Sequence, residues 1–280
     1  MNAWQLPGFI QLLDLAIMED LATGDVTSAA LLSDSATGQA ALTAKENCVI
    51  AGQHIAETVF KRVDPDLVYS FLVQDGQKAK AGQTIASVNG KLKSILAAER
   101  TALNFLQRLC GIATKTDYYV SLVNNPLCKI VDTRKTLPGY RLLDKYAVRQ
   151  GGGFNHRFSL GDGVLIKDNH IKACDSISNA VKRARQNAHH TVRIQVEVTC
   201  LEEAEEAFKA KVDALLLDNM DCHTVKKITD IYGSQLMIEC SGNITSKTIQ
   251  LYAVTGVHMI SIGALTHSVR AADISLDIES

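Results

Sequence analysis

Apolar residues recur along the chain with two different spacings, and the change between them comes near residue 127. Before that point, helical spacing predicts one helix over residues 6–22 and a longer helix over 94–123, which Gly111 is expected to interrupt. Short apolar runs between residues 39 and 90 are typical of strands, with one helix-like segment at 54–62. We therefore expect helices and strands to be mixed in the first third of the chain.

The segment at residues 75–90 contains Gly76 and Gly82 at turn spacing, which is typical of a hairpin. A lipoyl-type carrier module would need a modified lysine at the tip of such a hairpin. Lys78 and Lys80 do not lie in an evident frame for that role, so we interpret the segment as scaffold.

After residue 127, strand-length apolar runs alternate with helix-length segments. This alternation predicts parallel strands joined by right-handed crossovers. The strand candidates are residues 128–132, 163–167, 192–198, 213–217, 235–240 and 257–262. The helix candidates are residues 139–150, 175–188, 201–210, 221–232 and 245–254. Six such units could close into a barrel or form an open, doubly wound sheet.

Polar side chains follow every one of these strand candidates. They are Asp132–Lys135, Lys167–His170, Glu197, Asp218 and Asn219, Glu239 with Ser241–Asn243, and Ser261–Ala264. In a βα barrel the C-terminal ends of all strands form one rim that carries the active site, whereas an open sheet concentrates reactive groups at one switch point. The pattern favours an α/β fold with a six-stranded parallel βα barrel.

Composition limits the class of protein further. At 280 residues with 46% apolar residues, the chain is long enough for one large domain or two ordinary ones. The formal net charge of −1 and the 5% aromatic content give no indication of nucleic-acid binding. The N-terminal segment has Asp14 in its apolar part and no basic leader, which argues against a secretory signal, and no apolar run is long enough to cross a bilayer.

The seven cysteines are odd in number, scattered, and form no C-x-x-C pair. This arrangement argues against a disulfide framework and against a thiolate metal site. Because most of them lie in or beside apolar runs, we expect small buried hydrophobic residues in a reducing cytoplasm.

Positive charge is concentrated in residues 129–172, which carry nine Lys or Arg and four Asp. Most clusters of this kind are solvated basic surfaces. Here, however, several cations flank turns and the ends of apolar runs, and the break at Gly151–Gly153 lies among them with His156 and His170. This placement predicts side chains that converge on a small anionic ligand.

The last two strand candidates are followed by Ser241–Asn243 and Ile262–Ala264, both of which contain glycine. Backbone N–H groups in such loops can approach a phosphate, as they commonly do after the final strands of barrels. Glu197 and Asp218 precede them and offer oxygen ligands for ribose hydroxyls or Mg²⁺, although either could instead cap a strand end. The rim thus fits a phosphorylated sugar facing an acidic second substrate.

Several longer segments make a resemblance specific. They are EDLATGDVT, ERTALNFLQRLCGIAT, DTRKTLPGYRLLDKYAVRQGGGFNHR, VLIKDNHI, LLLDNM, ECSGNI and SIGALTHS. In this order, over nearly the whole chain, they resemble the quinolinate phosphoribosyltransferase (decarboxylating) family. The resemblance implies an N-terminal α+β sandwich domain at residues 1–110 and a barrel domain at 111–280, with the C-terminal tail packing back on the first domain. It also implies a cytoplasmic homodimer whose sites are completed by the neighbouring subunit.

The implied reaction converts quinolinate and phosphoribosyl pyrophosphate into nicotinate mononucleotide, CO₂ and pyrophosphate, with Mg²⁺ as cofactor, in NAD biosynthesis. The resemblance assigns quinolinate binding to Thr133, Arg134, His156, Arg157 and Lys167, and to Arg100 of the neighbouring chain. It assigns phosphoribosyl pyrophosphate to Lys135, Glu197 and Asp218, the three residues with catalytic roles, and to Ser241, Gly242, Asn243, Ile262, Gly263 and Ala264. Glu197 and Asp218 would also hold the metal, directly or through water. His170 would contact the binding residues and not the substrates.

The chain departs from the family pattern in few places: Phe158 and Ser159 follow His156-Arg157, and Leu137 stands where threonine is common. None of these removes a charged group. Three rival readings remain open: a molybdenum-transport accessory paralogue without decarboxylation, a barrel aldolase using Lys167 as a Schiff base, and a non-enzymatic ligand-binding or carrier module.

Overall fold

The computed structural model describes residues 7–279, and Leu6 of the first expected helix lies outside them. The chain packs into two compact units. The first unit contains the chain up to Asp117, Thr136–Gly152 and the chain from Leu265 onward, and the second contains Tyr118–Lys135 and Gly153–Ala264. The domain boundary that we expected at residue 110 stays a prediction. The first unit is assembled from three separate segments of the chain.

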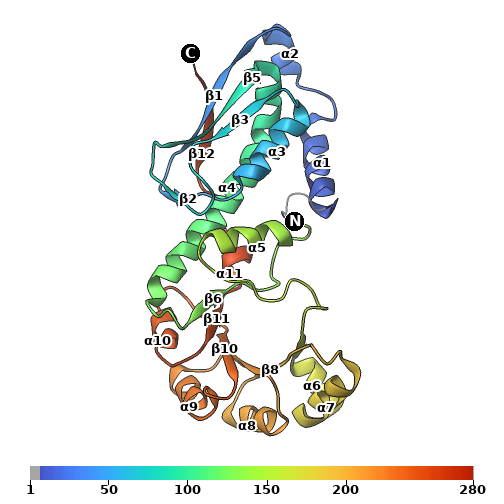
Figure 1. The fold of residues 1–280 in the computed structure, drawn as a ribbon, viewed down its shortest axis with the longest axis vertical. Helices are drawn as coiled ribbons and strands as arrows, with labels where there is room; N and C mark the ends of the chain where they lie inside the picture. The colour runs from blue at the N-terminus through green and yellow to red at the C-terminus, as the bar shows by residue number, and fades with distance from the viewer. Residues whose placement is uncertain (1–6, 280) are drawn as a thin grey trace. The chain divides into compact units, whose positions relative to one another are not determined.

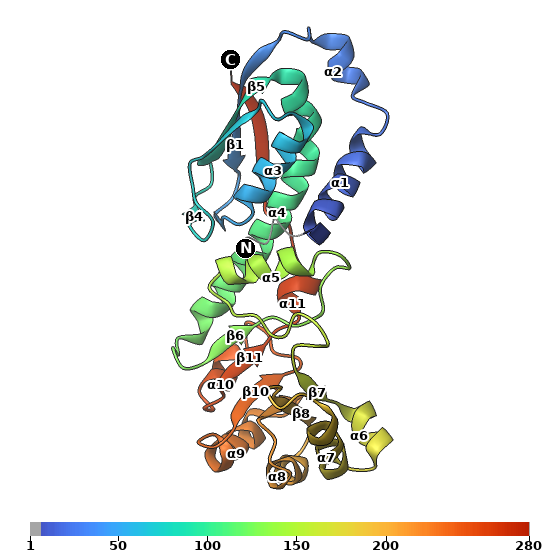
Figure 2. The same ribbon diagram turned by 45° about the vertical axis from the view of Figure 1, so that its right-hand side comes forward.

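The first unit contains helices and antiparallel strands, drawn in Figure 1 mainly in blue and green. Its elements are α1 (Pro7–Leu21), α2 (Val26–Leu31), β1 (Thr37–Ala44), β2 (Cys48–Val49), α3 (Gln53–Val63), β3 (Val68–Phe71), β4 (Lys78–Ala79), β5 (Thr84–Lys91), most of α4 (Leu92–Val123), α5 (Arg141–Gln150), most of α11 (Ala264–His267) and β12 (Ile274–Glu279). One sheet has the order β12-β1-β5-β3, and β2 pairs with β4 in a second, two-stranded sheet. Figures 1 and 2 show α3 and α4 along one face of the larger sheet.

Two local expectations in this unit are wrong. The segment at residues 75–90 is not a hairpin, because β4 pairs with β2 whereas β5 pairs with β1 and β3. Gly111 does not interrupt the long helix, since α4 runs without a break through it. A Cβ atom on Gly111 would lie 2.2 Å from the carbonyl oxygen of Arg270, so the glycine permits the C-terminal tail to approach the helix.

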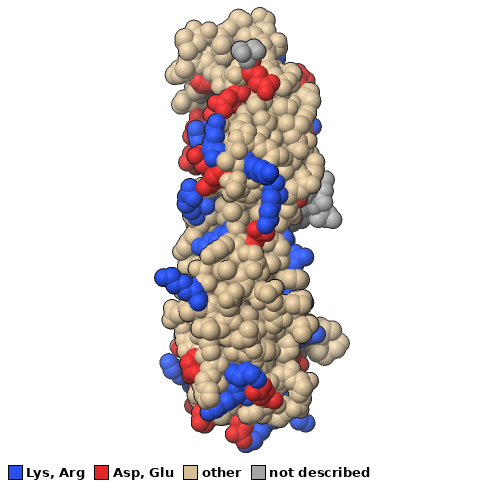
Figure 3. All heavy atoms as spheres, turned by 90° about the vertical axis from the view of Figure 1, so that its left-hand side faces the viewer, with Lys and Arg blue, Asp and Glu red and all other residues tan. Residues whose placement is uncertain are grey.

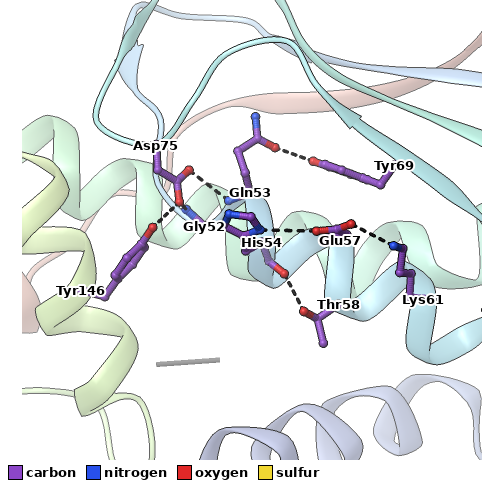
Figure 4. A network of polar contacts seen from close by, with 9 residues as sticks. All are labelled: Gly52, Gln53, His54, Glu57, Thr58, Lys61, Tyr69, Asp75 and Tyr146. Atoms are coloured by element: carbon purple, nitrogen blue, oxygen red, sulfur yellow. Dashed lines mark hydrogen bonds and ion pairs between the residues drawn. The ribbon is translucent and has the colours of Figure 1, made fainter. Parts of the chain in front are cut away.

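A network of polar contacts surrounds Asp75 in the first unit (Figure 4). The Asp75 carboxylate accepts hydrogen bonds from the backbone N–H groups of Gly52 (2.9 Å) and Gln53 (3.1 Å), which begin α3, and from the hydroxyl of Tyr146 on α5. The buried Gln53 amide donates to two backbone carbonyls and accepts from Tyr69. Asp75 thus caps α3 from a distant loop, because Gly52 has no side chain with which to do so.

From residue 164 onward the second unit alternates strands and helices as the sequence predicts. The helix expected at residues 139–150 belongs to the first unit instead, and the helix at Asp168–Cys174 was not expected. The elements of the second unit are β6 (Lys129–Val131), β7 (Val164–Ile166), α6 (Asp168–Cys174), α7 (Ile177–Asn187), β8 (Ile194–Val198), α8 (Leu201–Lys209), β9 (Ala214–Asp218), α9 (Cys222–Tyr232), β10 (Met237–Ser241), α10 (Ile249–Ala253) and β11 (Met259–Ser261). All pairs are parallel, and the strand order is β6-β11-β10-β9-β8-β7. Figures 1 and 2 show the helices on the outer side of these strands. The expected six-stranded α/β architecture is confirmed.

The barrel has one seam, between its first and last strands in the hydrogen-bonding order. Among the described residues no ladder joins β6 to β7, and a single parallel bridge between Val131 and Phe154 lies there. The Phe154 N–H donates to Ile130, and the Asp132 N–H donates to Phe154. The segment before β7 therefore runs beside β6 and covers part of its edge.

Three further observations concern expectations from composition. None of the helices in residues 7–279 has the length and apolar character to cross a membrane. All seven cysteines are free thiols, and Cys48, Cys110, Cys128 and Cys240 are buried. On the face drawn in Figure 3, basic and acidic side chains are intermixed.

Candidate active site

The strands of the second unit have one apolar side and one mixed side, on which polar residues lie beside apolar ones such as Val131 and Leu216. Residues in register on neighbouring parallel strands project to the same side of a sheet, and so do residues two apart on one strand. The strand register places on one side the buried residues Ile130, Ile166, Val196, Leu215, Leu217, Ile238 and Ile260. It places on the other side Gln195, Glu197, Asp218, Glu239, Ser241 and Ser261, and helices cover the apolar side. The polar residues therefore line the inner side of the barrel.

Lys167 and Glu197 meet at the ends of the adjacent strands β7 and β8. The Lys167 Nζ lies 2.9 Å from a carboxylate oxygen of Glu197, and the lysine is about half exposed while the glutamate is mostly covered. The Lys167 N–H donates to Nδ1 of His170 (3.0 Å), and the His170 N–H donates back to the Lys167 carbonyl (2.8 Å). His170 thus fixes the backbone that carries Lys167 at the start of α6.

Arg134 and Arg157 place two cations close together. The Arg157 Nη1 donates to the carbonyl of Gly163 at 3.0 Å. Burial, and then the charge of Arg134, lower the pKa of Arg157, while Asp162 opposes the shift. The Nε of Arg134 is buried, and within residues 7–279 it has no hydrogen-bond partner. A buried donor beside a second cation indicates a site for an anion, because leaving such a group unpaired costs about 1–3 kcal/mol.

Asp132 holds the loop that carries His156 and Arg157. Its side chain is fully buried and accepts from Asn155 Nδ2 (2.6 Å) and from the His156 N–H (2.8 Å). Asp132 directly follows β6, so it attaches the loop before β7 to the end of that strand. From the sequence, Asp132 is expected at a strand end, but no role is expected for it. The feature of the sequence that could have indicated this role is a carboxylate directly after an apolar run.

Thr133 and Lys135 lie in the turn that follows. The Lys135 N–H donates to the Thr133 hydroxyl at 3.0 Å, and the Lys135 side chain is exposed. This local bond shapes the turn between the buried Asp132 and the exposed lysine.

Asp218, Asn219 and Asn243 form a chain of side-chain hydrogen bonds at the ends of β9 and β10. Asn219 Nδ2 donates to Asp218 (2.8 Å), and Asn243 Nδ2 donates to Asn219 Oδ1 (3.0 Å). A Cβ atom on Gly242, whose φ is +93°, would lie 2.2 Å from the same Asn219 oxygen. Glycine is therefore required in the Ser241–Asn243 loop by both its backbone and its neighbour. Asn219 received no role from the sequence.

Ile262–Ala264 follow β11 and were expected to cradle a phosphate. The Ile262 N–H donates to the Val131 carbonyl at 3.0 Å, so this group already serves the pairing of β11 with β6. The expected phosphate contacts of Ile262, Gly263 and Ala264 stay predictions.

Most of the predicted site residues belong to the second unit, and one belongs to the first. Those in the second unit are Thr133, Arg134, Lys135, His156, Arg157, Lys167, His170, Glu197, Asp218, Ser241, Gly242, Asn243, Ile262, Gly263 and Ala264. Arg100 belongs to the first unit, where it is exposed on α4. Its predicted role in the site of a neighbouring chain stays a prediction.

Within the described residues no group of three or more His, Cys, Asp or Glu side chains is arranged to hold a metal ion. Glu197 and Asp218 end adjacent strands and project to the same inner side. Two carboxylates fit Mg²⁺, which keeps several waters and commonly binds through one or two carboxylates plus substrate phosphates. The donor set is thus compatible with Mg²⁺ brought by a phosphorylated substrate.

The chain is similar to known proteins over nearly its whole length. The sequence matches the quinolinate phosphoribosyl transferase N-terminal domain over residues 25–110 and the C-terminal domain over residues 112–277. A probable nicotinate-nucleotide pyrophosphorylase (carboxylating) of Bacillus subtilis is 42% identical over 278 residues, covering 99% of this chain and 95% of that protein. The quinolinate phosphoribosyltransferase (decarboxylating) 1b of Nicotiana tabacum is 38% identical and covers 99% of this chain and 83% of its own length. The solved nicotinate-nucleotide pyrophosphorylase of Francisella tularensis superposes with a TM-score of 0.94 at 39% identity, covering 100% of this chain and 99% of the other.

Proposed function

The chain belongs to the quinolinate phosphoribosyltransferase family, and we propose that it catalyses the family reaction. It transfers the phosphoribosyl group of phosphoribosyl pyrophosphate to quinolinate and releases CO₂ and pyrophosphate. The product is nicotinate mononucleotide, and the process is de novo NAD biosynthesis. The single observation that carries the proposal is the pair Arg134 and Arg157, with a buried donor that lacks a partner in the described chain.

Quinolinate occupies the cationic part of the site. It carries two carboxylates on adjacent ring atoms, and guanidinium groups bind carboxylates through two parallel hydrogen bonds. Arg134 and Arg157 hold these carboxylates, Lys167 adds a third cation, and Thr133 and His156 complete the binding surface. Each bound carboxylate reduces the repulsion between the arginines.

Phosphoribosyl pyrophosphate occupies the opposite part. Glu197 and Asp218 accept hydrogen bonds from the ribose hydroxyls, and Ser241–Asn243 with Ile262–Ala264 surround the 5′-phosphate. Lys135, exposed at the end of its turn, binds the pyrophosphate end. The Asn219–Asn243 hydrogen bond supports this arrangement by holding the phosphate loop against the end of β9.

Mg²⁺ is the proposed cofactor, and Glu197 and Asp218 would hold it directly or through water. Bound there, it would neutralise charge on the departing pyrophosphate. Lys167 has a second task beside these carboxylates, because its 2.9 Å contact with Glu197 keeps that acidic group oriented in the absence of substrate.

The reaction follows from the arrangement of charge. As pyrophosphate departs with Lys135 as counter-ion, positive charge develops at C1 of the ribose. The quinolinate nitrogen attacks that carbon and becomes cationic. The cationic ring then stabilises the electron pair left at the adjacent carbon when its carboxylate leaves as CO₂, and that carbon takes up a proton. No covalent nucleophile is needed, so the protein acts by positioning and electrostatics.

The protein is further proposed to act in the cytoplasm as a homodimer in which Arg100 of one subunit contacts quinolinate in the other. Supporting this, Arg100 is an exposed cation on the regular helix α4. A residue that serves a site in another copy has to be exposed in the single chain.

One assay separates the proposal from its rivals. The protein is mixed with quinolinate labelled at the 2-carboxylate, phosphoribosyl pyrophosphate and Mg²⁺, and released CO₂ and nicotinate mononucleotide are measured. We expect both products in equal amounts and neither after chelation of Mg²⁺. Nucleotide binding without CO₂ would favour a binding module or the molybdenum-related paralogue. Borohydride trapping of a carbonyl compound on Lys167 would favour the aldolase.

A further inference from the structure

Glu239 is a charged side chain inside the barrel that none of the roles above uses. It lies on β10 and is only 2% exposed. Burial raises the pKa of Glu239, but its interactions with His156 and then Gln195 outweigh burial and leave the pKa below its usual value. A buried carboxylate that remains ionised must be held by donors, since an isolated charge would otherwise be too costly there.

Two donors from different parts of the unit converge on one oxygen of Glu239. Gln195 Nε2 on β8 donates to Oε2 at 2.8 Å, and His156 Nε2 lies 3.4 Å from the same oxygen. Strand β9 lies between β8 and β10, so Gln195 reaches across it on the inner side. The small residue Ala214, in register with Gln195, leaves space for this contact.

The other ring nitrogen of His156 defines the position of its proton. The Arg157 backbone N–H donates to Nδ1 of His156 at 2.7 Å. A nitrogen that accepts a hydrogen bond carries no proton, so the proton of the neutral ring is on Nε2, facing Glu239. The backbone N–H of His156 is held separately by Asp132 at 2.8 Å.

These contacts form a chain from the barrel interior to the cationic site. Gln195 orients Glu239, Glu239 orients the His156 ring, and that ring accepts from the backbone of Arg157. The Arg157 guanidinium then reaches Gly163 and lies near Arg134. Both ring nitrogens of His156 have partners within the protein, so the ring is held in a fixed orientation beside Arg157.

We propose that Glu239 is a positioning residue, which fixes the Nε2-protonated form of His156 and through it the place of Arg157 in the dicarboxylate site. This inference rests on the proposed function for its kinetic consequence. Its structural part, the tautomer of His156, stands without it. Glu239 touches neither substrate in this scheme, and its effect is confined to the quinolinate side.

The first test uses the unmodified protein. Nitrogen NMR of the ¹⁵N-histidine-labelled protein distinguishes protonated from unprotonated ring nitrogens, and the His156→Gln spectrum identifies which of the eight histidine signals belongs to His156. At neutral pH we expect Nε2 protonated and Nδ1 unprotonated. A ring protonated on Nδ1 would overturn the proposal, and this result does not depend on any catalytic activity.

The second test is kinetic. Glu239→Met removes the acceptor at similar size and is expected to raise the KM for quinolinate by about 10- to 100-fold, the range for loss of a hydrogen bond to a charged group. The KM for phosphoribosyl pyrophosphate should stay within about twofold, because Glu197 and Asp218 are untouched. Glu239→Gln keeps a carbonyl oxygen for both donors and should restore most of the quinolinate affinity.

The matched control is Asp213→Asn. Asp213 is also a carboxylate that accepts from a neighbouring strand, at the Ile194 N–H (2.6 Å), but it precedes β9 at the opposite ends of the strands. We expect no change in either KM. Equal rises of both KM values in Glu239→Met, or no rise in either, would overturn the proposal.

The remaining outcomes are also decisive. If Glu239→Met fails to fold, the test rests on Glu239→Gln and on the tautomer of His156 in the wild-type protein. A changed protonation of the His156 ring nitrogens in Glu239→Gln, together with an unchanged KM for quinolinate, would contradict the chain of contacts. If the wild-type protein makes no nicotinate mononucleotide, the proposed function fails. The Nε2 proton facing Glu239 would then still support the positioning of His156.

Discussion

The polar network around Asp75 in the first unit and the strand-end network of the second differ in how completely they are paired. In the first, Asp75 accepts from two N–H groups and a tyrosine, and the Gln53 amide has partners at both ends. In the second, Arg134 and Arg157 lie close together, and a buried nitrogen of Arg134 has no partner in the described chain.

This difference in pairing distinguishes polar residues that stabilise the fold from polar residues that bind a ligand. A fully paired network rigidifies its surroundings and gains little from further contacts. A network with neighbouring like charges lowers stability until an anion binds. The two networks should therefore respond in opposite ways to substitution: the first in the free energy of unfolding, the second in affinity for substrate.

The largest effect is expected from Arg157→Ala. It removes a cation that holds a carboxylate, so kcat/KM for quinolinate should fall by about 100-fold or more, the range for charge-assisted bonds. The KM for phosphoribosyl pyrophosphate should change far less, and the free energy of unfolding should stay the same or rise, since the arginines no longer repel. Steady-state kinetics and urea unfolding measure both, with the exposed Arg193→Ala as control. Equal loss of affinity for both substrates would contradict the assignment.

Mixing two inactive variants is expected to restore part of this activity. If Arg100 serves the neighbouring subunit, dimers made of one Arg100→Ala chain and one Arg157→Ala chain contain one intact site. Random assembly should recover roughly a quarter of the wild-type rate. The variants are unfolded together, refolded and assayed beside each variant refolded alone. No recovery would mean that Arg100 does not act across subunits.

Asp75→Ala should act on stability instead. It leaves the start of α3 uncapped and the Tyr146 hydroxyl without its acceptor, which together cost about 2–4 kcal/mol. The rate per folded molecule should be unchanged. Urea unfolding provides the measurement, and Asp25→Ala is the matched control, because Asp25 caps α2 through two N–H groups but binds no tyrosine. If Asp25→Ala lowers the free energy of unfolding as much as Asp75→Ala does, the network around Asp75 contributes no more than an ordinary helix cap.

The smallest effect is expected from alkaline pH. Burial, and then the charge of Asp75, raise the pKa of both Tyr69 and Tyr146 in the folded state. A group whose pKa is raised by folding contributes stability below its unfolded pKa, about 10 for tyrosine. Stability should therefore be steady up to about pH 10 and fall above it. Tyr146→Phe should make that fall shallower in urea unfolding at several pH values, and an identical slope would contradict this.

The sequence predicted the features of the second unit that depend on local pattern. Apolar runs of strand length, separated by amphipathic segments, located β6 to β11 within a few residues, because each strand must bury one apolar side. Polar residues at the ends of those runs, such as Lys167, Glu197 and Asp218, were located for the same reason. The parallel order of the strands then brings them to one inner side.

Features that depend on distant contacts were not predictable. The sequence predicts a helix break at Gly111, but glycine is needed there because the Arg270 carbonyl oxygen approaches the helix closely. The convergence of Gln195 and His156 on Glu239 joins three segments through barrel curvature, which no local spacing encodes. The seam between β6 and β7 likewise depends on how the barrel closes in three dimensions. The roles of the individual site residues stay predictions.

The pairing of β12 with β1 has a consequence for synthesis on the ribosome. Residues 37–44 form β1 early, yet their partner Ile274–Glu279 is the last stretch of described chain to be made. Until it emerges, the eight-residue strand β1 is itself the edge of the sheet, while every strand of the second unit has already been translated. Unpaired edges invite association with other chains. The newborn molecule is therefore more prone to aggregation before residues 274–279 are made, and a truncation that removes these residues would make that state permanent.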